Sequence, residues 1–123
     1  MLITNLTQHD ASESQIAAGV AAHPEQGALR LLLTIGTIDE AAPAALIERA
    51  ERIAEMAAAT GAQAAMIGGH LGLTASVAKA LKARGITPLL SFSERRSVDE
   101  HLPDGKVIKR AVFEHIGFSE FPV

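Results

Sequence analysis

Short apolar runs alternate with amphipathic stretches along this chain, and each kind of pattern predicts one type of element. The clearest short run, residues 64–67, has no polar alternation and stops at Gly68-Gly69. That pattern is typical of a strand buried on both faces in the middle of a parallel sheet. Residues 1–6 and 86–92 have the same character and predict two further strands.

Three stretches have the apolar spacing of a helix that lies on a sheet. The longest, residues 43–60, starts with Pro43, which suits the first turn of a helix, and stops at Gly61. The stretch after Gly69 repeats an apolar residue every four positions and stops at Gly85, so it predicts a second helix. The charged residues on the outer face of the longest helix are expected to form a solvated surface.

The third helix depends on weaker signals near the N-terminus. Ser12 and Gln15 have the form of a capping box, which predicts a helix that begins just after Ser12 and ends at Pro24. Gly19 falls inside that helix and is expected to weaken it by about 1 kcal/mol relative to alanine. Residues 29–34 then predict the second strand, although a helix that begins near Pro24 is also compatible with them.

The last third of the chain predicts a β-hairpin over residues 93–118. Asp104-Gly105 favours a two-residue turn in which both central residues have positive φ. Counting outward from this turn places opposite charges across the strands, among them Arg95 opposite Glu114, each pair contributing about 0.2–1 kcal/mol. Arg95 would then be structural, and Arg96 on the opposite face would be the better ligand candidate.

Strands that alternate with helices predict an α/β fold. We expect a three-layer, Rossmann-like sheet that is mostly parallel, with right-handed crossovers and the antiparallel hairpin at its C-terminal end. The 123 residues are expected to form one domain, since a chain of this length holds a single core.

Composition then limits the class of function. The chain has no cysteine, which excludes disulfides, thiolate metal sites and a cysteine nucleophile and agrees with a cytoplasmic location. A net charge of -3 argues against binding long DNA or RNA, which requires a basic face. No apolar run approaches the roughly 18 residues of a membrane span, and no signal peptide is evident. Binding of a small anionic ligand by a few local cations is still compatible with this charge.

Ligands of an open α/β sheet bind outside the carboxyl ends of its strands. The predicted strand ends place amides, hydroxyls, imidazoles, guanidiniums and a glycine turn there, from Asn5, Thr7, Gln8, His9, Gly68, Gly69, His70, Ser91, Ser93, Arg95 and Arg96. Guanidinium groups and bare backbone N–H groups suit phosphate oxygens. Proton transfer near neutral pH would fall to His9 or His70, because imidazole titrates in that range.

Other sites compete for the same residues. A divalent metal could be held by His9, Asp10 and His70, although no HxH or HxxxH spacing supports it. The Gly-x-Ser-x-Gly elbow, the Walker phosphate loop and the GxGxxG fingerprint are missing, which argues against a serine hydrolase, an NTPase and an NAD enzyme. We therefore expect no metal and no cofactor. The remaining histidines are expected at the surface or in the hairpin: His23, His101 and His115.

Both ends of the chain resemble a known family. The chain opens with Asn5-Leu6-Thr7-Gln8-His9 and, shortly after, Glu13-x-Gln15. Its C-terminal part contains Gly85-Ile86-x-Pro88, Ser91, Glu94-Arg95, Ser97-Val98, Pro103-Asp104-Gly105-Lys106, Val112-Phe113, His115 and Gly117-Phe118. These segments are similar to those of the small CRISPR-associated ring nucleases, which have a CARF-like (Rossmann-type) fold. Phage and plasmid proteins of unknown function contain similar segments.

The resemblance implies an activity in antiviral defence. The protein would bind cyclic oligoadenylate, with cyclic tetra-adenylate as the first candidate, and cleave it without a metal. A ribose 2′-OH would attack the adjacent phosphate and leave a 2′,3′-cyclic phosphate. The resemblance also implies roles: His9 as general base or acid, Arg96, Gly68 and Gly69 as phosphate ligands, and Asn5, Thr7, Gln8 and Ser91 as ribose or adenine ligands.

A cyclic ligand with rotational symmetry is best held by a twofold pair of subunits, so we expect a homodimer. Two other functions stay open from the residues alone. The same pocket could sequester the messenger without cutting it, or the domain could be structural, with its hairpin offering an edge strand to a partner.

Overall fold

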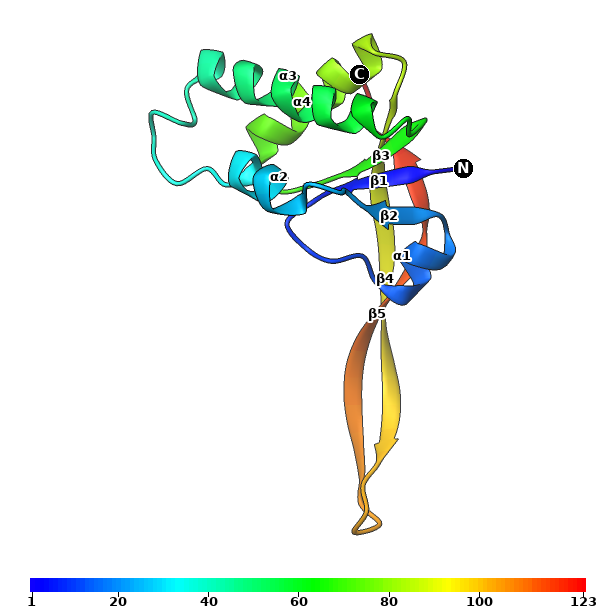
Figure 1. Ribbon diagram of the computed structural model, residues 1–123. Helices are drawn as coiled ribbons and strands as arrows, with labels where there is room; N and C mark the ends of the chain where they lie inside the picture. Colours follow the sequence, from blue (N-terminus) through cyan, green and yellow to red (C-terminus); the bar gives the residue numbers. More distant parts are fainter.

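The computed structural model describes all residues, 1–123, and contains one five-stranded sheet in the order β2-β1-β3-β4-β5 (Figure 1). Strands β1 (Ile3–Leu6), β2 (Val20–Ala22), β3 (Ala64–Ile67) and the first part of β4 (Thr87–His101) pair in parallel. Strand β5 (Val107–Glu120) runs antiparallel to β4. The predicted α/β fold, a mostly parallel sheet with a C-terminal antiparallel hairpin, is confirmed.

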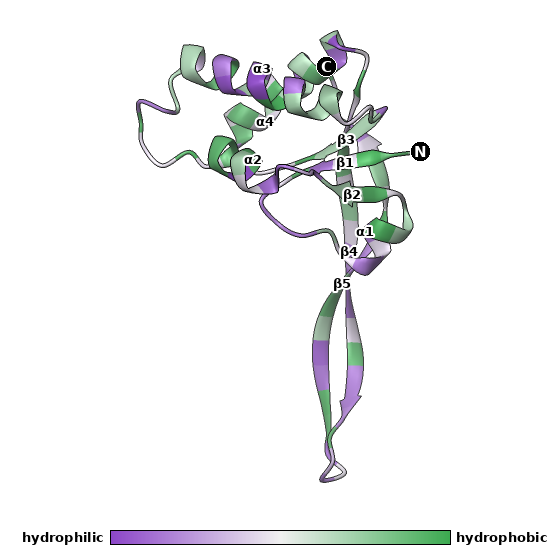
Figure 2. Ribbon diagram, in the orientation of Figure 1, coloured by the Kyte–Doolittle hydropathy of each residue, from purple (hydrophilic) through white to green (hydrophobic).

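The two faces of the sheet are covered unequally. Ala65 and Ile67 of β3 belong to the main core with α2 (Gln26–Leu33), α3 (Pro43–Ala59) and α4 (Leu71–Ala83). Ala64 and Met66 point to the other face and pack in a smaller cluster beside the short helix α1 (Glu13–Ala17). Apolar residues accordingly gather where helices meet the sheet (Figure 2). None of the helices combines the length and hydrophobicity that crossing a bilayer requires.

The segment between β1 and α3 differs from the sequence prediction. The capping box of Ser12 and Gln15 is present, but α1 ends at Ala17, and the next residues form β2. Residues 26–33 form helix α2 rather than a strand. Leu29 and Leu33 are its buried positions, four residues apart, so the run of leucines has the period of a helix. The strand prediction for residues 29–34 was wrong because this spacing was not distinguished from a continuous apolar strand.

Gly19 lies between the end of α1 and the start of β2, and its substitution tests this boundary. Its φ is +109°, and an added Cβ would lie 2.6 Å from the carbonyl oxygen of Met1. Gly19→Ala is therefore expected to destabilise the protein by about 2 kcal/mol or more in urea unfolding. Gly27→Ala is the control, because Gly27 lies in α2 with nothing near its added Cβ, and it should be neutral or stabilising. A Gly19→Ala protein as stable as the wild type would contradict the assigned turn.

Arg49 on α3 caps the carboxyl end of α2, so it is more than a solvated surface residue. Its guanidinium donates to the backbone oxygens of Leu32 at 3.1 Å and Thr34 at 2.8 Å, and it also pairs with Glu40. Arg49→Ala should lower the free energy of unfolding by about 1–3 kcal/mol, since charged hydrogen bonds to helix-end carbonyls are lost. The exposed neighbour Arg52 is the control, and Arg52→Ala should change stability by less than about 0.5 kcal/mol. Equal losses for both variants would contradict the capping role.

The hairpin turn has three residues rather than two. The backbone N–H of Leu102 donates to the oxygen of Lys106 at 2.8 Å, which closes the loop around Pro103-Asp104-Gly105. Only Gly105 has positive φ, at +85°, because the carboxylate of Asp104 instead accepts the N–H of Lys106. This loop length shifts the register by one residue from the predicted one.

The observed register exchanges the two arginines. Arg95 lies opposite Phe113. Arg96 instead makes the ion pair with Glu114, with 2.8 Å between its Nε and a carboxylate oxygen, and its guanidinium is also 4.0 Å from the carboxylate of Glu94. The predicted pairing of Arg95 with Glu114 was therefore wrong, and Arg95 has no carboxylate within ion-pair distance. The predicted fourth strand and first hairpin strand are one continuous strand, β4, with an irregularity of the ladder between Phe92 and Ser93.

Candidate functional site

The strand order places a crevice between β1 and β3. β1 has β2 on one side and β3 on the other, so the connections leave the sheet toward opposite faces at this point. A hollow of about 290 Å³ lies at the carboxyl ends of these strands. Its lining consists of Thr7, Gln8, His9, Asp10, Gln15, Met66, Ile67, Gly68, Gly69, Leu90 and Ser91. The loops after β1 and β3, two residues within β4 and one residue of α1 therefore meet at one rim, which includes six of the predicted candidates.

Asn5 is the buried support of this rim rather than part of its surface. Its side chain is 1% exposed, donates to the backbone oxygen of His9 at 2.8 Å, and accepts from the N–H and the hydroxyl of Thr7 at 2.9 and 2.7 Å. These bonds fold the residues after β1 back on the strand end. Asn5 therefore positions Thr7 and His9, and its predicted contact with a ligand gives way to an indirect role.

The glycine turn leaves the backbone open to the hollow. An added Cβ at Gly69 would meet no atom within 4 Å, and φ of Gly69 is +114°, which favours glycine. The nearest atom to a Cβ at Gly68 is Cγ2 of Thr7, at 3.8 Å. Helix α4 begins directly after this turn, so the positive end of its dipole also lies at this edge.

His70 caps helix α4 and does not line the hollow. Its Nδ1 accepts the backbone N–H of Leu73 at 3.2 Å, as an N-cap side chain does. The imidazole of His9 differs, because it lines the hollow and makes no hydrogen bond with the protein. Of the two predicted imidazoles, His9 is the one that is free to exchange a proton with a ligand.

A second imidazole reaches the hollow through Ser91. The hydroxyl of Ser91 lies 2.7 Å from Nδ1 of His115 and accepts from Nε2 of Gln15 at 3.1 Å. His115 is half-buried against the ring of Phe118, with ring centroids 4.4 Å apart. The sequence placed His115 at the surface or in the hairpin and gave Gln15 only its capping role. This contact was missed at the level of sequence because the predicted hairpin had another register. In the observed register His115 is opposite Ser93, on the face of β4 that also bears Ser91.

His23 is also not a surface residue. It is 5% exposed, its Nε2 lies 2.9 Å from the backbone oxygen of Met56, and its Nδ1 accepts the N–H of Glu25 at 2.9 Å. Both ring nitrogens are thereby satisfied as a neutral imidazole that donates through Nε2. His23 is a structural link between the end of β2 and α3.

Ser93, Arg95 and Arg96 lie beyond the hollow. They belong to the hairpin arm, residues 93–115, the part of β4 and β5 that extends away from the body (Figure 1). Arg96 is five residues past Ser91, roughly 17 Å along an extended strand. The hollow therefore has no lysine or arginine in its lining, and its one carboxylate, Asp10, pairs with Arg30 at 2.7 Å.

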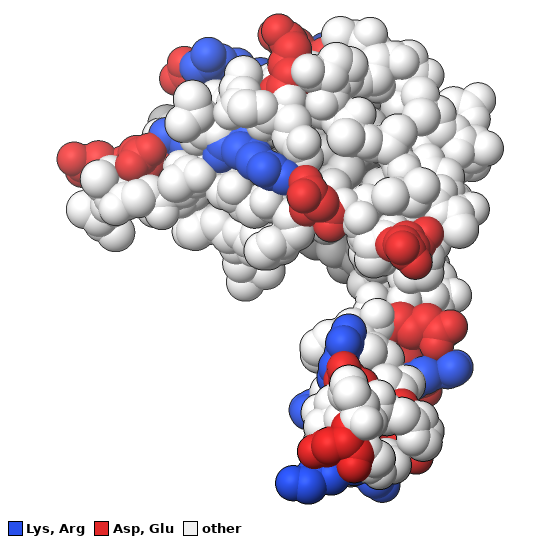
Figure 3. All heavy atoms as spheres, turned by 60° about the horizontal axis from the view of Figure 1, so that its bottom comes forward, with Lys and Arg blue, Asp and Glu red and all other residues white.

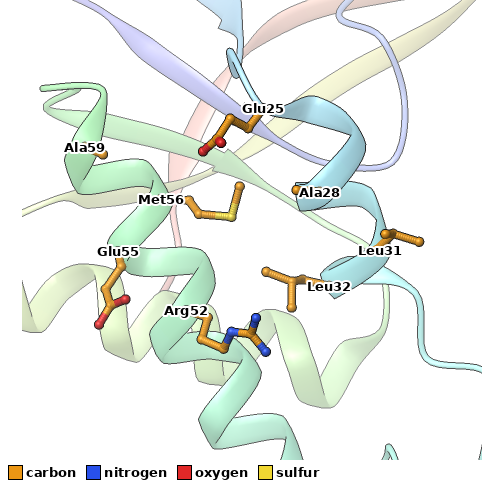
Figure 4. Close-up of a pocket in the computed structure, with 8 residues that line it drawn as sticks. All are labelled: Glu25, Ala28, Leu31, Leu32, Arg52, Glu55, Met56 and Ala59. Carbon is orange, nitrogen blue, oxygen red and sulfur yellow. The ribbon is translucent and has the colours of Figure 1, made fainter.

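Two alternatives to this site fail on geometry. No group of three His, Asp or Glu side chains is close enough to hold one metal ion, so the competing site at His9, Asp10 and His70 is not formed. A larger hollow of about 490 Å³ opens between α2 and α3 (Figure 4). Its lining is mostly apolar, contains neither an imidazole nor a hydroxyl, and has Glu25, Arg52 and Glu55 as its charged residues.

Comparison with known proteins gives one match. The model of a family described as "Uncharacterized protein MJ1673 family" matches residues 1–119, which is nearly the whole chain and includes every residue of the hollow. No curated protein and no solved structure matches the chain.

Proposed function

Since the chain belongs to the MJ1673 family, whose description states no activity, we propose its function from the hollow at the β1–β3 crevice. The protein binds cyclic oligoadenylate there, with cyclic tetra-adenylate as the first candidate, and cleaves it as a metal-independent ring nuclease. The observation that carries this proposal is that His9 and the open Gly68-Gly69 backbone line one hollow at the switch point of the sheet. The resemblance of the chain's ends to small CRISPR-associated ring nucleases supports the same activity.

The glycine turn favours a phosphate at this edge. A phosphate needs several directed donors at short range, and a backbone without side chains lets its oxygens approach closely. The dipole of α4 adds positive potential at the same place. Thr7, which is the neighbour of Gly68, and Gln8 also line the hollow, and a hydroxyl and an amide suit the hydroxyls and base edges of a nucleotide.

Cleavage needs proton transfer, alignment and stabilisation of the charge on the phosphoryl oxygens. The 2′ oxygen attacks the neighbouring phosphorus, the bond from phosphorus to the 5′ oxygen breaks, and a 2′,3′-cyclic phosphate and a 5′-OH are left. The proton of the 2′-OH goes to a base, and the departing 5′ oxygen receives one. His9 is free for one of these transfers, and Ser91, in contact with His115, is placed for the other. The crevice supplies the alignment.

A single-turnover assay tests this function. Purified protein in excess over cyclic tetra-adenylate, with a metal chelator present, should yield linear products that end in a 2′,3′-cyclic phosphate. Intact ligand after prolonged incubation at stoichiometric concentration would overturn the nuclease proposal. Products that appear only when metal is added would overturn the mechanism.

One observation favours a second candidate, a protein that binds the messenger without cutting it. No side chain or carbonyl orients the His9 imidazole, whereas a catalytic histidine is usually held by a hydrogen-bond partner. A binding protein would need the same hollow and no proton transfer. Calorimetry beside the product assay separates the two, because tight binding without products supports sequestration.

A further inference from the structure

The hairpin arm is an unsupported element. Its two strands pair only with each other, and no helix covers either face beyond the contact of Ser14 with His115 at its base (Figure 1). A two-stranded ribbon is at best marginally stable alone in water. Large apolar side chains are nevertheless exposed on it, with Phe113 at 72% and Val107 at 51%. Such a surface requires a partner.

The charges of the arm indicate which partner it fits. The arm has five cations and five anions and is neutral, although the whole chain has a net charge of -3. Both signs are intermingled on its surface (Figure 3). A nucleic acid would need a basic excess, whereas the face with Phe113 carries both signs, with Arg95, Lys109 and Asp99, and can pair with a second copy of itself across a twofold axis. The charged residues are Glu94, Arg95, Arg96, Asp99, Glu100, Asp104, Lys106, Lys109, Arg110 and Glu114.

The face that bears Phe113 continues the face that borders the hollow. Side chains two residues apart on a strand share a face, so Ser91, Ser93 and Arg95 lie on one side of β4. Phe113 is opposite Arg95 on that side, and Arg96 is on the other side with Glu114. The free cation and the exposed aromatic ring are therefore both on the side of the hollow.

We infer that two copies of the chain pair through this face of their arms, and that Arg95 of the partner subunit supplies the cation that the hollow lacks. The second part rests on the proposed function, since a cation stabilises the charge on the phosphoryl oxygens during cleavage and the lining contains none. Arg95 cannot serve its own hollow, because it is four residues past Ser91, roughly 13 Å along the strand. A twofold axis through the base of the two arms, near Ser93, would place Arg95 of the partner subunit beside Ser91 of the hollow.

Self-association tests the first part without any nucleotide. Analytical ultracentrifugation should find a dimer at micromolar concentration. Phe113→Ala should raise its dissociation constant at least about tenfold, as loss of an aromatic anchor at an interface does. Ile38→Ala is the matched control, because Ile38 is 87% exposed on the body between α2 and α3 and should leave association unchanged. Circular dichroism should show that both variants are folded. A monomeric wild type, or equal effects of the two variants, would overturn pairing through the arm.

Subunit mixing tests the shared site. His9→Ala and Arg95→Ala proteins should each be impaired alone, but co-expressed they should recover about a quarter of the wild-type cleavage rate, because half of the dimers then contain one intact composite site. No recovery, or an Arg95→Ala protein with wild-type activity, would overturn the role of Arg95. A dimer that neither binds nor cleaves cyclic tetra-adenylate would instead refute the proposed function and leave pairing through the arm intact.

Discussion

His9→Ala is expected to slow cleavage of cyclic tetra-adenylate by at least about tenfold, with little change in affinity. His9 lines the hollow next to the glycine turn, and its ring is not engaged by any protein group. Its backbone oxygen, not its ring, anchors the loop, so removal of the imidazole leaves the fold of the rim in place. Single-turnover rates of the variant and the wild type measure this difference.

His101→Ala is the matched control for this prediction. His101 is an exposed imidazole at the far end of the arm, opposite Val107, and it has no contact with the hollow. Its replacement should leave the rate unchanged. If His9→Ala cleaves as fast as the wild type, proton transfer by His9 is refuted.

Asn5→Ala is expected to cost about 2–4 kcal/mol of the free energy of unfolding, the largest loss among the stability variants. The fully buried side chain makes three hydrogen bonds, and its removal leaves a cavity and a Thr7 N–H without its acceptor. Where the variant is still folded, it should bind cyclic tetra-adenylate at least about tenfold more weakly, because the loop that bears His9 loses its anchor.

Gln8→Ala is the control for the stability loss expected of Asn5→Ala. Gln8 lies in the same segment, and its only side-chain bond is to the hydroxyl of Thr34 at 2.9 Å. Gln8→Ala should change the unfolding free energy by less than about 0.5 kcal/mol in urea titrations. If the two variants are equally stable, Asn5 is not the support of the rim.

Elements with strong local signals could be predicted from the sequence. The long helix and the strand at residues 64–67 agree closely with α3 and β3, because helical period and an uninterrupted apolar run are properties of neighbouring residues. The gathering of His9, Gly68, Gly69 and Ser91 also followed, since parallel strands end at one edge.

Features that depend on distant partners could not be predicted. The helix α2 and the strand β2 were exchanged, because a three-residue strand has no pattern of its own until it pairs with β1. One residue in the loop length moved every cross-strand pair of β4 from Ser93 to His101. That shift hid the contact of Ser91 with His115 and reversed which of Arg95 and Arg96 is engaged by a carboxylate.

The most direct test of the central claim is a titration of isotope-labelled His9→Ala protein with cyclic tetra-adenylate, followed by backbone amide chemical shifts. The variant should bind without turnover, and the largest shifts should fall on Thr7, Gly68, Gly69 and Ser91, which line one hollow. Saturating ligand that leaves these amides unmoved would contradict a nucleotide site at the β1–β3 crevice.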